Sequence, residues 1–178
     1  MCEGEGELVL VDQHAAHERV AFGRLRAAHG RRELRRQRLL FPLPVELDEA
    51  TAAVAERPGV LEALGFEVER TGPRHVNVRA VPEILKDADP KPLLADVLGE
   101  LAEESDPAGG PTGAAIDHVL ATMACHSVVR AGDVLGRPEA IALLAQLDDV
   151  DLRSHCPHGR PVMLRLPLAE IERRFGRV

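Results

Sequence analysis

The chain has 178 residues, of which 45% are hydrophobic and only 2% aromatic, and its formal net charge at pH 7 is −7. This length suits one domain or two small ones, and the lack of Trp and Tyr argues against stacking of nucleic-acid bases on aromatic side chains. The negative charge argues against a domain that holds DNA by itself, and no apolar run approaches the roughly 18 residues of a membrane-spanning helix. The odd number of cysteines, three, and the lack of a secretory signal predict a cytoplasmic location with free or metal-bound thiols.

The first predicted elements are a strand and a helix. Residues 8–11 are four consecutive apolar residues, which predicts a fully buried strand. Asp12 follows that strand and is a favoured residue for capping a helix, here predicted over residues 14–28. Residues 38–47 are rich in Leu and Val but contain two prolines, so they predict an edge strand or an extended connector.

The rest of the chain predicts alternating helices and short strands. In chain order we expect a helix at 49–64, a hairpin of 66–70 and 75–81, helices at 92–103, 114–131 and 138–147, a strand at 161–166 and a final helix at 168–175. Pro58 is expected to interrupt the first of these helices and Gly65 to end it. The Pro- and Gly-rich residues 106–112 predict a linker. Together these elements predict the α+β class.

Positive charge is concentrated in one stretch. Between Arg19 and Arg38 there are eight arginines and one acid, Glu33. A solvated helix face with its turn would explain this pattern, and so would a strip of side chains that contacts phosphate groups. Because the overall charge repels DNA, we predict weak intrinsic DNA binding that depends on a recruiting partner.

Two short segments contain residues that bind metal ions. In a helix that begins near His14, the side chains of His14 and Glu18 lie on one face, directly after Asp12. Cys156 and His158 are two residues apart, so in an extended segment they point to the same side. A set of carboxylates, imidazoles and a thiolate suits zinc, or manganese with less sulfur involvement. A polar helix start and a buried cysteine would explain the same residues without a metal.

Read together, the two segments resemble the C-terminal domain of the MutL family of mismatch-repair proteins. Residues 12–18, D-Q-H-A-A-H-E, match the start of the motif D-Q-H-A-x-x-E-x-x-x-x-E of its nuclease-bearing members. Residues 156–161, C-P-H-G-R-P, match another family block in full. Residues 37–42, 124–126 and 175–177 resemble three further blocks in the expected order, so the similarity extends over nearly the whole chain.

The chain departs from the family pattern at three places. Gly23 stands where the first motif should end in Glu, and His126 replaces a basic residue. The chain also begins too late to contain the strand that the family places before residues 8–11. Since the family's ATPase domain and linker are absent as well, we interpret the chain as a C-terminal portion of a longer protein or as a product that has lost its front half.

The resemblance implies a two-subdomain α/β architecture. Residues 1–48 and 113–178 would form a dimerisation and endonuclease subdomain with a mixed sheet, and residues 49–112 an inserted, smaller regulatory subdomain. It also implies a homodimer that acts on DNA together with the DNA sliding clamp, and a mismatch-recognition protein that contacts the absent N-terminal part. No membrane association is expected.

The implied activity is metal-dependent nicking of duplex DNA, with Zn²⁺ and/or Mn²⁺ lowering the pKa of a bound water. The expected catalytic residues are Asp12, His14 and Glu18, and the expected metal ligands are these three with Cys156, His158 and, as a weaker candidate, Cys125. Burial within its helix is the alternative role for Cys125. Arg160 would steady a phosphate or, alternatively, orient a carboxylate by a salt bridge.

A docking segment for the clamp is expected at residues 37–41. Gln37, Leu40 and Phe41 form the Q-x-x-L-F pattern of clamp-binding peptides, in which the amide forms hydrogen bonds and the apolar side chains enter a pocket. The alternative is an ordinary core-facing strand that buries Leu39 and Phe41.

Two other classes of function stay open. Gly23 would fit a dimerisation and clamp-docking module whose nuclease site has decayed, although the five other candidate ligands are all retained. A purely structural zinc domain would need a closed site of four ligands.

Overall fold

The computed structural model describes residues 2–4, 6–103, 113–127, 135–148 and 161–177. The chain divides into two compact units, a terminal unit of Met1–Val20 with Val129–Val178 and a middle unit of Ala21–Val128. Helices and small sheets occur in both, which confirms the predicted α+β class. The predicted subdomains, divided near residues 48 and 112, rest on the resemblance and stay a prediction. No helix in the described ranges is both long enough and apolar enough to cross a membrane.

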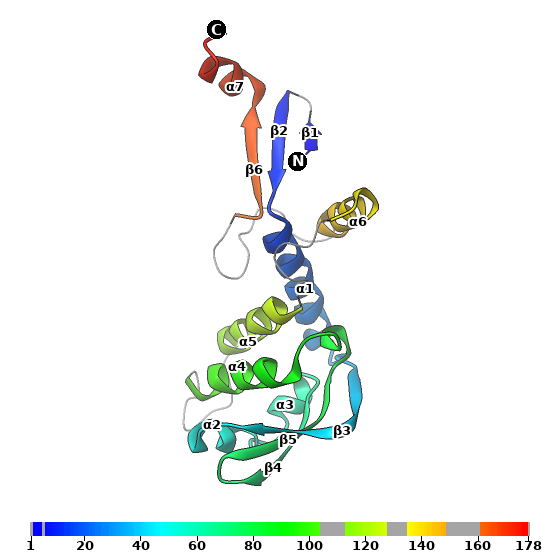
Figure 1. The fold of residues 1–178 in the computed structure, drawn as a ribbon, viewed down its shortest axis with the longest axis vertical. Coiled ribbons are helices and arrows are strands. Elements are labelled where there is room, and N and C mark those ends of the chain that lie inside the picture. Colours follow the sequence, from blue (N-terminus) through cyan, green and yellow to red (C-terminus); the bar gives the residue numbers. More distant parts are fainter. Residues whose placement is uncertain (1, 5, 104–112, 128–134, 149–160, 178) are drawn as a thin grey trace. The chain divides into compact units, whose positions relative to one another are not determined.

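A three-stranded antiparallel sheet forms much of the terminal unit, with the order β1-β2-β6 (Figure 1). The elements of this unit are β1 (Cys2–Gly4), β2 (Glu7–Val11), the first part of α1 (Gln13–Gly30), α6 (Arg137–Asp148), β6 (Met163–Pro167) and α7 (Leu168–Arg174). The predicted strands at 8–11 and 161–166 and the helices that follow them are confirmed, with small shifts of their ends. The strand at the start of the chain and the strand near its end are thus neighbours, with Leu10 opposite Leu164.

The expectation that no strand precedes residues 8–11 was wrong. Cys2–Gly4 forms β1 and pairs with β2 in the register Cys2↔Val9. Three residues flanked by charged and glycine positions carry too little pattern to predict a strand. The pairing depends on Gly6, whose φ of 76° lies in the left-handed region that a tight turn uses and glycine adopts at little cost.

The expectation that residues 8–11 are fully buried was also wrong, because all five residues of β2 are half-buried. Among the described residues, the buried core of the terminal unit lies instead between α1 and α6. It includes Ala15, Ala16, Val20, Leu143, Leu147 and Val162. The described elements therefore leave the apolar strand β2 incompletely covered.

The middle unit has an antiparallel sheet in the order β3-β5-β4, which makes β3 an edge strand as predicted. Its elements are the rest of α1, β3 (Arg36–Glu46), α2 (Glu49–Val54), α3 (Val60–Ala63), β4 (Glu67–Gly72), β5 (His75–Pro82), the 3-10 helix η1 (Glu83–Leu85), α4 (Pro90–Glu103) and α5 (Gly113–His126). Figure 1 shows α4 and α5 layered over this sheet. The predicted hairpin is confirmed as β4 and β5, and the predicted helix at 92–103 as α4.

The core of the middle unit follows from periodicity. On α4 the apolar residues recur at the helical period, and all of them are buried: Leu93, Leu94, Val97, Leu98 and Leu101. On β5 alternate residues are buried, and they pack with α4 and with the fully buried Phe66. Each large apolar side chain buried in this way stabilises the fold by roughly 1.5–3 kcal/mol.

Local signals fixed the ends of several helices. The predicted helix at 49–64 is interrupted around Pro58 and becomes α2 and α3. Gly65, with φ at 85°, ends the second piece, and a β-carbon at this position would lie 3.3 Å from that of Pro82. At α5 the prediction was too long, because the helix ends at His126 rather than at residue 131. There the Ser127 hydroxyl donates to the Ala124 carbonyl at 2.6 Å, a local bond that competes with continuation of the helix. The predicted linker at 106–112 lies outside the described residues.

Candidate metal centre and docking segment

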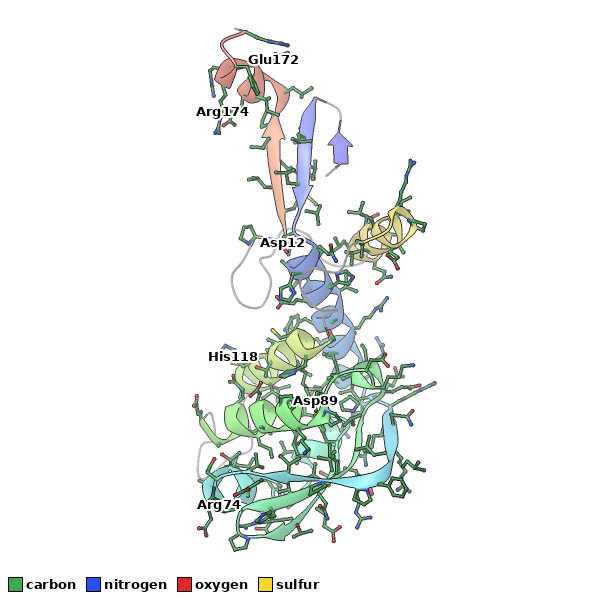
Figure 2. The ribbon with its side chains drawn as sticks, viewed as in Figure 1. Asp12, Arg74, Asp89, His118, Glu172 and Arg174 are labelled. Atoms are coloured by element: carbon green, nitrogen blue, oxygen red, sulfur yellow. The ribbon has the colours of Figure 1, made fainter. Side chains whose placement is uncertain are left out.

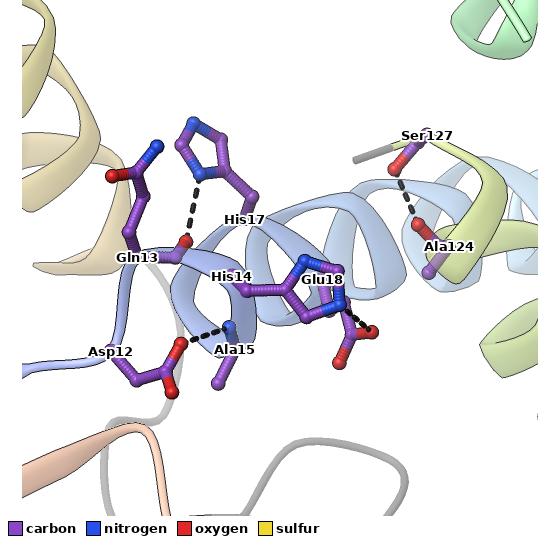
Figure 3. Close-up of polar contacts among 8 residues, drawn as sticks. All are labelled: Asp12, Gln13, His14, Ala15, His17, Glu18, Ala124 and Ser127. Carbon is purple, nitrogen blue, oxygen red and sulfur yellow. Dashed lines mark hydrogen bonds and ion pairs between the residues drawn. The ribbon is translucent and has the colours of Figure 1, made fainter. Parts of the chain in front are cut away.

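Asp12 lies where β2 passes into α1 (Figures 2 and 3). Its Oδ1 accepts a hydrogen bond from the Ala15 N–H at 3.0 Å, and its carbonyl accepts one from Ala16 at 2.9 Å. These are the bonds of a helix N-cap, which satisfy donors that have no partner within the helix. The predicted capping role of Asp12 is confirmed. The other carboxylate oxygen, Oδ2, is not used by the cap.

The same residue ties the helix start to the C-terminal part of the chain. The Asp12 N–H donates to the Val162 carbonyl at 3.0 Å. Val162 directly follows the C-P-H-G-R-P block at 156–161. The sheet pairing of β2 with β6 therefore brings the end of that block to the first motif, although the two are about 140 residues apart in sequence.

His14 and Glu18 contact each other on the first turns of α1 (Figure 3). His14 Nε2 lies 3.1 Å from Glu18 Oε1, as the spacing of four residues predicts. Glu18 is 4% exposed and is the one buried charged residue in the described part of the chain. Burying a carboxylate is costly unless a cation or hydrogen-bond donors compensate for the lost hydration. A buried carboxylate against an imidazole is thus a feature that calls for a specific explanation.

The second ring nitrogen of His14 strengthens this point. His14 Nδ1 is buried and has no hydrogen-bond partner among the described residues. His17, one turn along the same helix, is instead satisfied by its own backbone, because its Nδ1–H donates to the Gln13 carbonyl at 2.8 Å. The Nδ1 atom of His14 is therefore available to bind a ligand. His17 takes no part in the contact between His14 and Glu18.

The remaining candidate ligands are only partly described. Cys125 lies on α5 in the middle unit and is half-buried. Cys156, His158 and Arg160 lie outside the described residues. Within the ranges that the structure covers, no three His, Cys, Asp or Glu side chains gather as a metal-binding group. The ligand set and the metal stay predictions.

Gly23 leaves the position of the motif's last Glu without a carboxylate. It lies inside α1, where a glycine costs roughly 0.5–1 kcal/mol relative to alanine.

Near the A-C-H block, residues 124–126, the structure shows a contact that the sequence did not reveal: His126 Nε2 lies 2.8 Å from Asp96 Oδ2 on α4. These residues are 30 positions apart and on different helices, so no local pattern links them.

The docking segment, residues 37–41, lies on an irregular part of β3. Arg38 pairs with Ala80 and Leu43 with Val78, so five steps along β3 are matched by only two along β5. The residues between Arg38 and Leu43 therefore form a bulge that leaves the ladder. Bulges occur at sheet edges and redirect side chains away from the regular alternation.

This bulge directs two large apolar side chains into solvent. Leu40 is 89% exposed and Phe41 is 75% exposed, whereas Leu39 packs against the core. The alternative of a strand that buries both Leu39 and Phe41 is thus wrong for Phe41. Gln37 is exposed, and its Nε2 donates to the Arg38 carbonyl at 3.0 Å.

The terminal unit also exposes apolar side chains. Leu164 on β6 is 52% exposed, Leu168 at the start of α7 is 44% exposed and Phe175 at its end is 78% exposed. They lie on the element pair β6–α7, next to the half-buried β2. Large apolar side chains exposed in this way are candidates for a protein interface.

These observations define a class of protein: an α+β domain with a buried carboxylate beside an imidazole at a helix start, exposed apolar side chains on β6 and α7, and a bulged edge strand. The family model described as the MutL C terminal dimerisation domain matches residues 1–135. The chain is 43% identical over 178 residues to the DNA mismatch repair protein MutL of Xanthomonas campestris pv. campestris (strain B100), covering 99% of this chain and 28% of the relative. It is 43% identical over 179 residues to the protein of the same name from Geobacter sulfurreducens, covering 100% of this chain and 29% of the relative.

The chain therefore belongs to the MutL C-terminal dimerisation domain family, which confirms the resemblance inferred from its motifs. A third relative, the MutL of Xylella fastidiosa (strain M12), is 44% identical over 171 residues, with 96% of this chain and 27% of the relative covered. The chain spans less than a third of the length of these curated relatives. A dimerisation domain is also consistent with the predicted homodimer.

Proposed function

We propose that the chain is the metal-dependent, DNA-nicking and homodimer-forming portion of a MutL-type mismatch-repair protein. The observation that carries the proposal is the pair formed by the buried Glu18 carboxylate and the His14 imidazole, one turn after Asp12. A buried carboxylate and an imidazole with an unused nitrogen suit a bound cation better than they suit a packed core.

The residues present fit a divalent ion. Asp12 and Glu18 would supply oxygen ligands and His14 a nitrogen ligand, a donor set that zinc and manganese accept. Bound there, the ion would lower the pKa of a water and stabilise charge on the phosphate. The cap bond to Ala15 holds the Asp12 carboxylate in a fixed position, so one of its oxygens is oriented before any ligand arrives.

The link between Asp12 and Val162 supports the contribution of Cys156 and His158. In the sequence, Val162 is four residues after His158 and six after Cys156, and its carbonyl accepts the Asp12 N–H. We therefore propose that both candidate ligands join Asp12 at the start of α1.

The test is the nicking of supercoiled plasmid with manganese, zinc or chelator. Glu18→Gln keeps the size of the side chain and removes its charge, so nicking should fall to the level of the chelator control. His17→Asn is the matched control, because it alters the same helix turn outside the pair and should leave nicking unchanged. Nicking by Glu18→Gln at the unaltered rate would refute the proposal.

The second candidate function is a dimerisation and docking module with a decayed nuclease, which Gly23 supports. Gly23→Glu distinguishes the two: it restores the motif, so a weak nuclease should become faster. A protein without nicking before and after this change, while it still dimerises and binds the clamp, would favour the module.

Docking on a DNA sliding clamp is part of both candidate functions, the nuclease and the dimerisation module. It is supported by the exposure of Leu40 and Phe41 on the bulge of β3, which leaves both side chains free to enter a pocket. A clamp would hold an acidic protein near DNA by raising its effective concentration there. Gln37→Ala/Phe41→Ala should abolish binding to immobilised clamp and leave circular dichroism unchanged. Ile84→Ala, which truncates another exposed apolar residue of the same unit, is the control, and equal clamp binding by both variants would contradict the proposal.

The homodimer surface is proposed to include β6 and α7. Leu168→Asp/Phe175→Asp places two charges on this surface and should shift light scattering from dimer to monomer. Leu40→Asp adds a charge at an apolar residue of the middle unit that is 89% exposed, and it should leave the dimer intact. An unchanged dimer in the first variant would exclude this surface. Contact with a mismatch-recognition protein stays a prediction, and it concerns the N-terminal part of the family's proteins rather than the residues of this chain.

A further inference from the structure

A basic groove lies at the end of α1 in the middle unit. It has a volume of about 680 Å³ and is lined by residues that include His29, Arg32, Leu34, Arg36 and Glu62. Residues 29–38 contain five arginines and one glutamate, although the whole chain has a net charge of −7. The groove is therefore a local positive region on an acidic protein.

Four of the five arginines of this stretch fall into two groups, and the fifth, Arg35, does not line the groove. Arg31 is paired with Glu33 at 2.7 Å and Arg38 with Glu67 at 3.3 Å, so their charges are compensated. Arg32 and Arg36, which line the groove, form no ion pair with the other described residues. Arg36 Nη2 donates to the Glu62 carbonyl at 3.3 Å, which holds its guanidinium beside the groove.

Hydrogen bonding to the last carbonyls of α1 does not explain the side chains of Arg32 and Arg36. The last carbonyls of α1 are already satisfied by backbone donors, Ala27 by the N–H of Arg31 at 3.2 Å and Ala28 by the N–H of Glu33 at 2.8 Å. Arg32 has a φ of 57°, and it is the one non-glycine residue in the described ranges with a positive φ. A side chain with a β-carbon is sterically disfavoured there, and a glycine or asparagine would form the turn more easily. Arg32 therefore places a positive charge at a backbone position that disfavours its side chain, which motivates a search for a use of that charge.

We propose that the groove binds the phosphate backbone of duplex DNA through Arg32 and Arg36. Guanidinium groups donate two parallel hydrogen bonds to phosphate oxygens and suit this ligand better than any other cationic side chain. The contact is independent of sequence and needs neither a metal nor nicking, so it goes beyond the proposed nuclease. It also lies directly before the docking segment, so DNA and clamp contacts would be supplied by one continuous stretch, residues 32–41.

The test is fluorescence anisotropy of a short labelled duplex, titrated with the purified chain in chelator so that nicking has no influence. Arg32→Asn/Arg36→Gln removes two charges with residues that tolerate the local backbone. Each phosphate contact contributes about 0.9 to the slope of log K against log salt, so this slope should fall by about 1.8. The affinity of the variant should then change roughly tenfold less than that of the unaltered chain between about 50 and 200 mM salt.

The control is Lys86→Gln/Lys91→Gln, which removes the same charge from exposed positions of the same unit and should leave the slope nearly unchanged. Glu62→Gln removes the acid from the groove and should tighten DNA binding, a gain that loss of folding cannot mimic. The proposal is overturned if both double variants lower the slope equally, or if Glu62→Gln does not increase affinity. Equal displacement of duplex by an acidic peptide of the same charge would assign the groove to a protein partner and also overturn it.

Discussion

The observed capping role of Asp12 and its proposed role as a metal ligand can be separated experimentally, because the first requires an oxygen atom and the second a negative charge. As a helix cap it accepts the Ala15 N–H at 3.0 Å, which an asparagine can do equally well. As a metal ligand it would use its charge, which asparagine lacks. Asp12→Asn should therefore keep the cap and lose the metal, whereas Asp12→Ala should lose both.

The loss of stability can be estimated from the cap bond. Replacing a capping Asp by Ala costs about 1 kcal/mol, and in a chain of this length about 1 kcal/mol lowers the melting temperature by roughly 2–4 °C. For Asp12→Asn the cap remains, and the lost attraction between its charge and the helix dipole is at most about 1 kcal/mol at low ionic strength and less when screened by salt. At about 0.15 M salt we expect Asp12→Ala to melt 2–4 °C lower and Asp12→Asn to melt within roughly 1 °C of the unaltered chain.

The melting temperature and the metal content of each variant must both be measured. Unfolding is followed by circular dichroism in chelator, because a bound ion would itself stabilise the folded state. Zinc and manganese contents are measured separately by mass spectrometry after equilibration with each metal. A melting temperature of Asp12→Asn as low as that of Asp12→Ala would refute the capping argument, and full metal content in Asp12→Asn would refute the ligand assignment.

Five further substitutions test the fold and its energetics. Gly23→Ala should stabilise the chain by roughly 0.5–1 kcal/mol in urea unfolding if α1 is uninterrupted there, and a loss of stability would show that the glycine is needed for close packing. Gly65→Ala should destabilise by more than about 1 kcal/mol, since its φ is 85° and a β-carbon would lie 3.3 Å from that of Pro82. Leu94→Ala should cost about 2–5 kcal/mol because Leu94 is fully buried, whereas Phe41→Ala, at a 75% exposed residue, should change stability by less than about 0.5 kcal/mol. The hydrogen bond from the Thr51 hydroxyl lowers the pKa of the Asp48 carboxyl, so its contribution should be present at neutral pH and be lost as the pH falls through that lowered pKa. The pH dependence of unfolding should then be weaker in Thr51→Val, and identical profiles would contradict this.

Features set by local sequence were predicted well. The helical period of residues 93–101, the alternation of β5 and the breaks at Pro58 and Gly65 each depend on neighbours within a few positions. At the candidate site, the Asp12 cap and the contact of His14 with Glu18 followed from spacing alone for the same reason.

Features set by distant contacts were not predicted. The strand β1 exists because β2 offers it a partner, and the half-burial of β2 depends on how little of the chain covers it. The bulge of β3 depends on its register with β5, and the contact of His126 with Asp96 joins two helices. Such pairings have no signature within one segment of a single sequence.

The bulge on β3 separates the residues that pair within the sheet from the residues whose side chains are exposed to solvent. Regular pairing resumes at Leu43, so the residues between Arg38 and Leu43 contribute little to the ladder, and two of them contribute little to the core. Substitutions at Leu40 and Phe41, and even the loss or gain of one residue between them, could accumulate without unfolding the sheet. A lineage could thus exchange one partner for another, or adapt to a drifting partner, by changes confined to a few codons. Genetic screens for folding would overlook those positions, whereas screens for binding to a partner would test them directly.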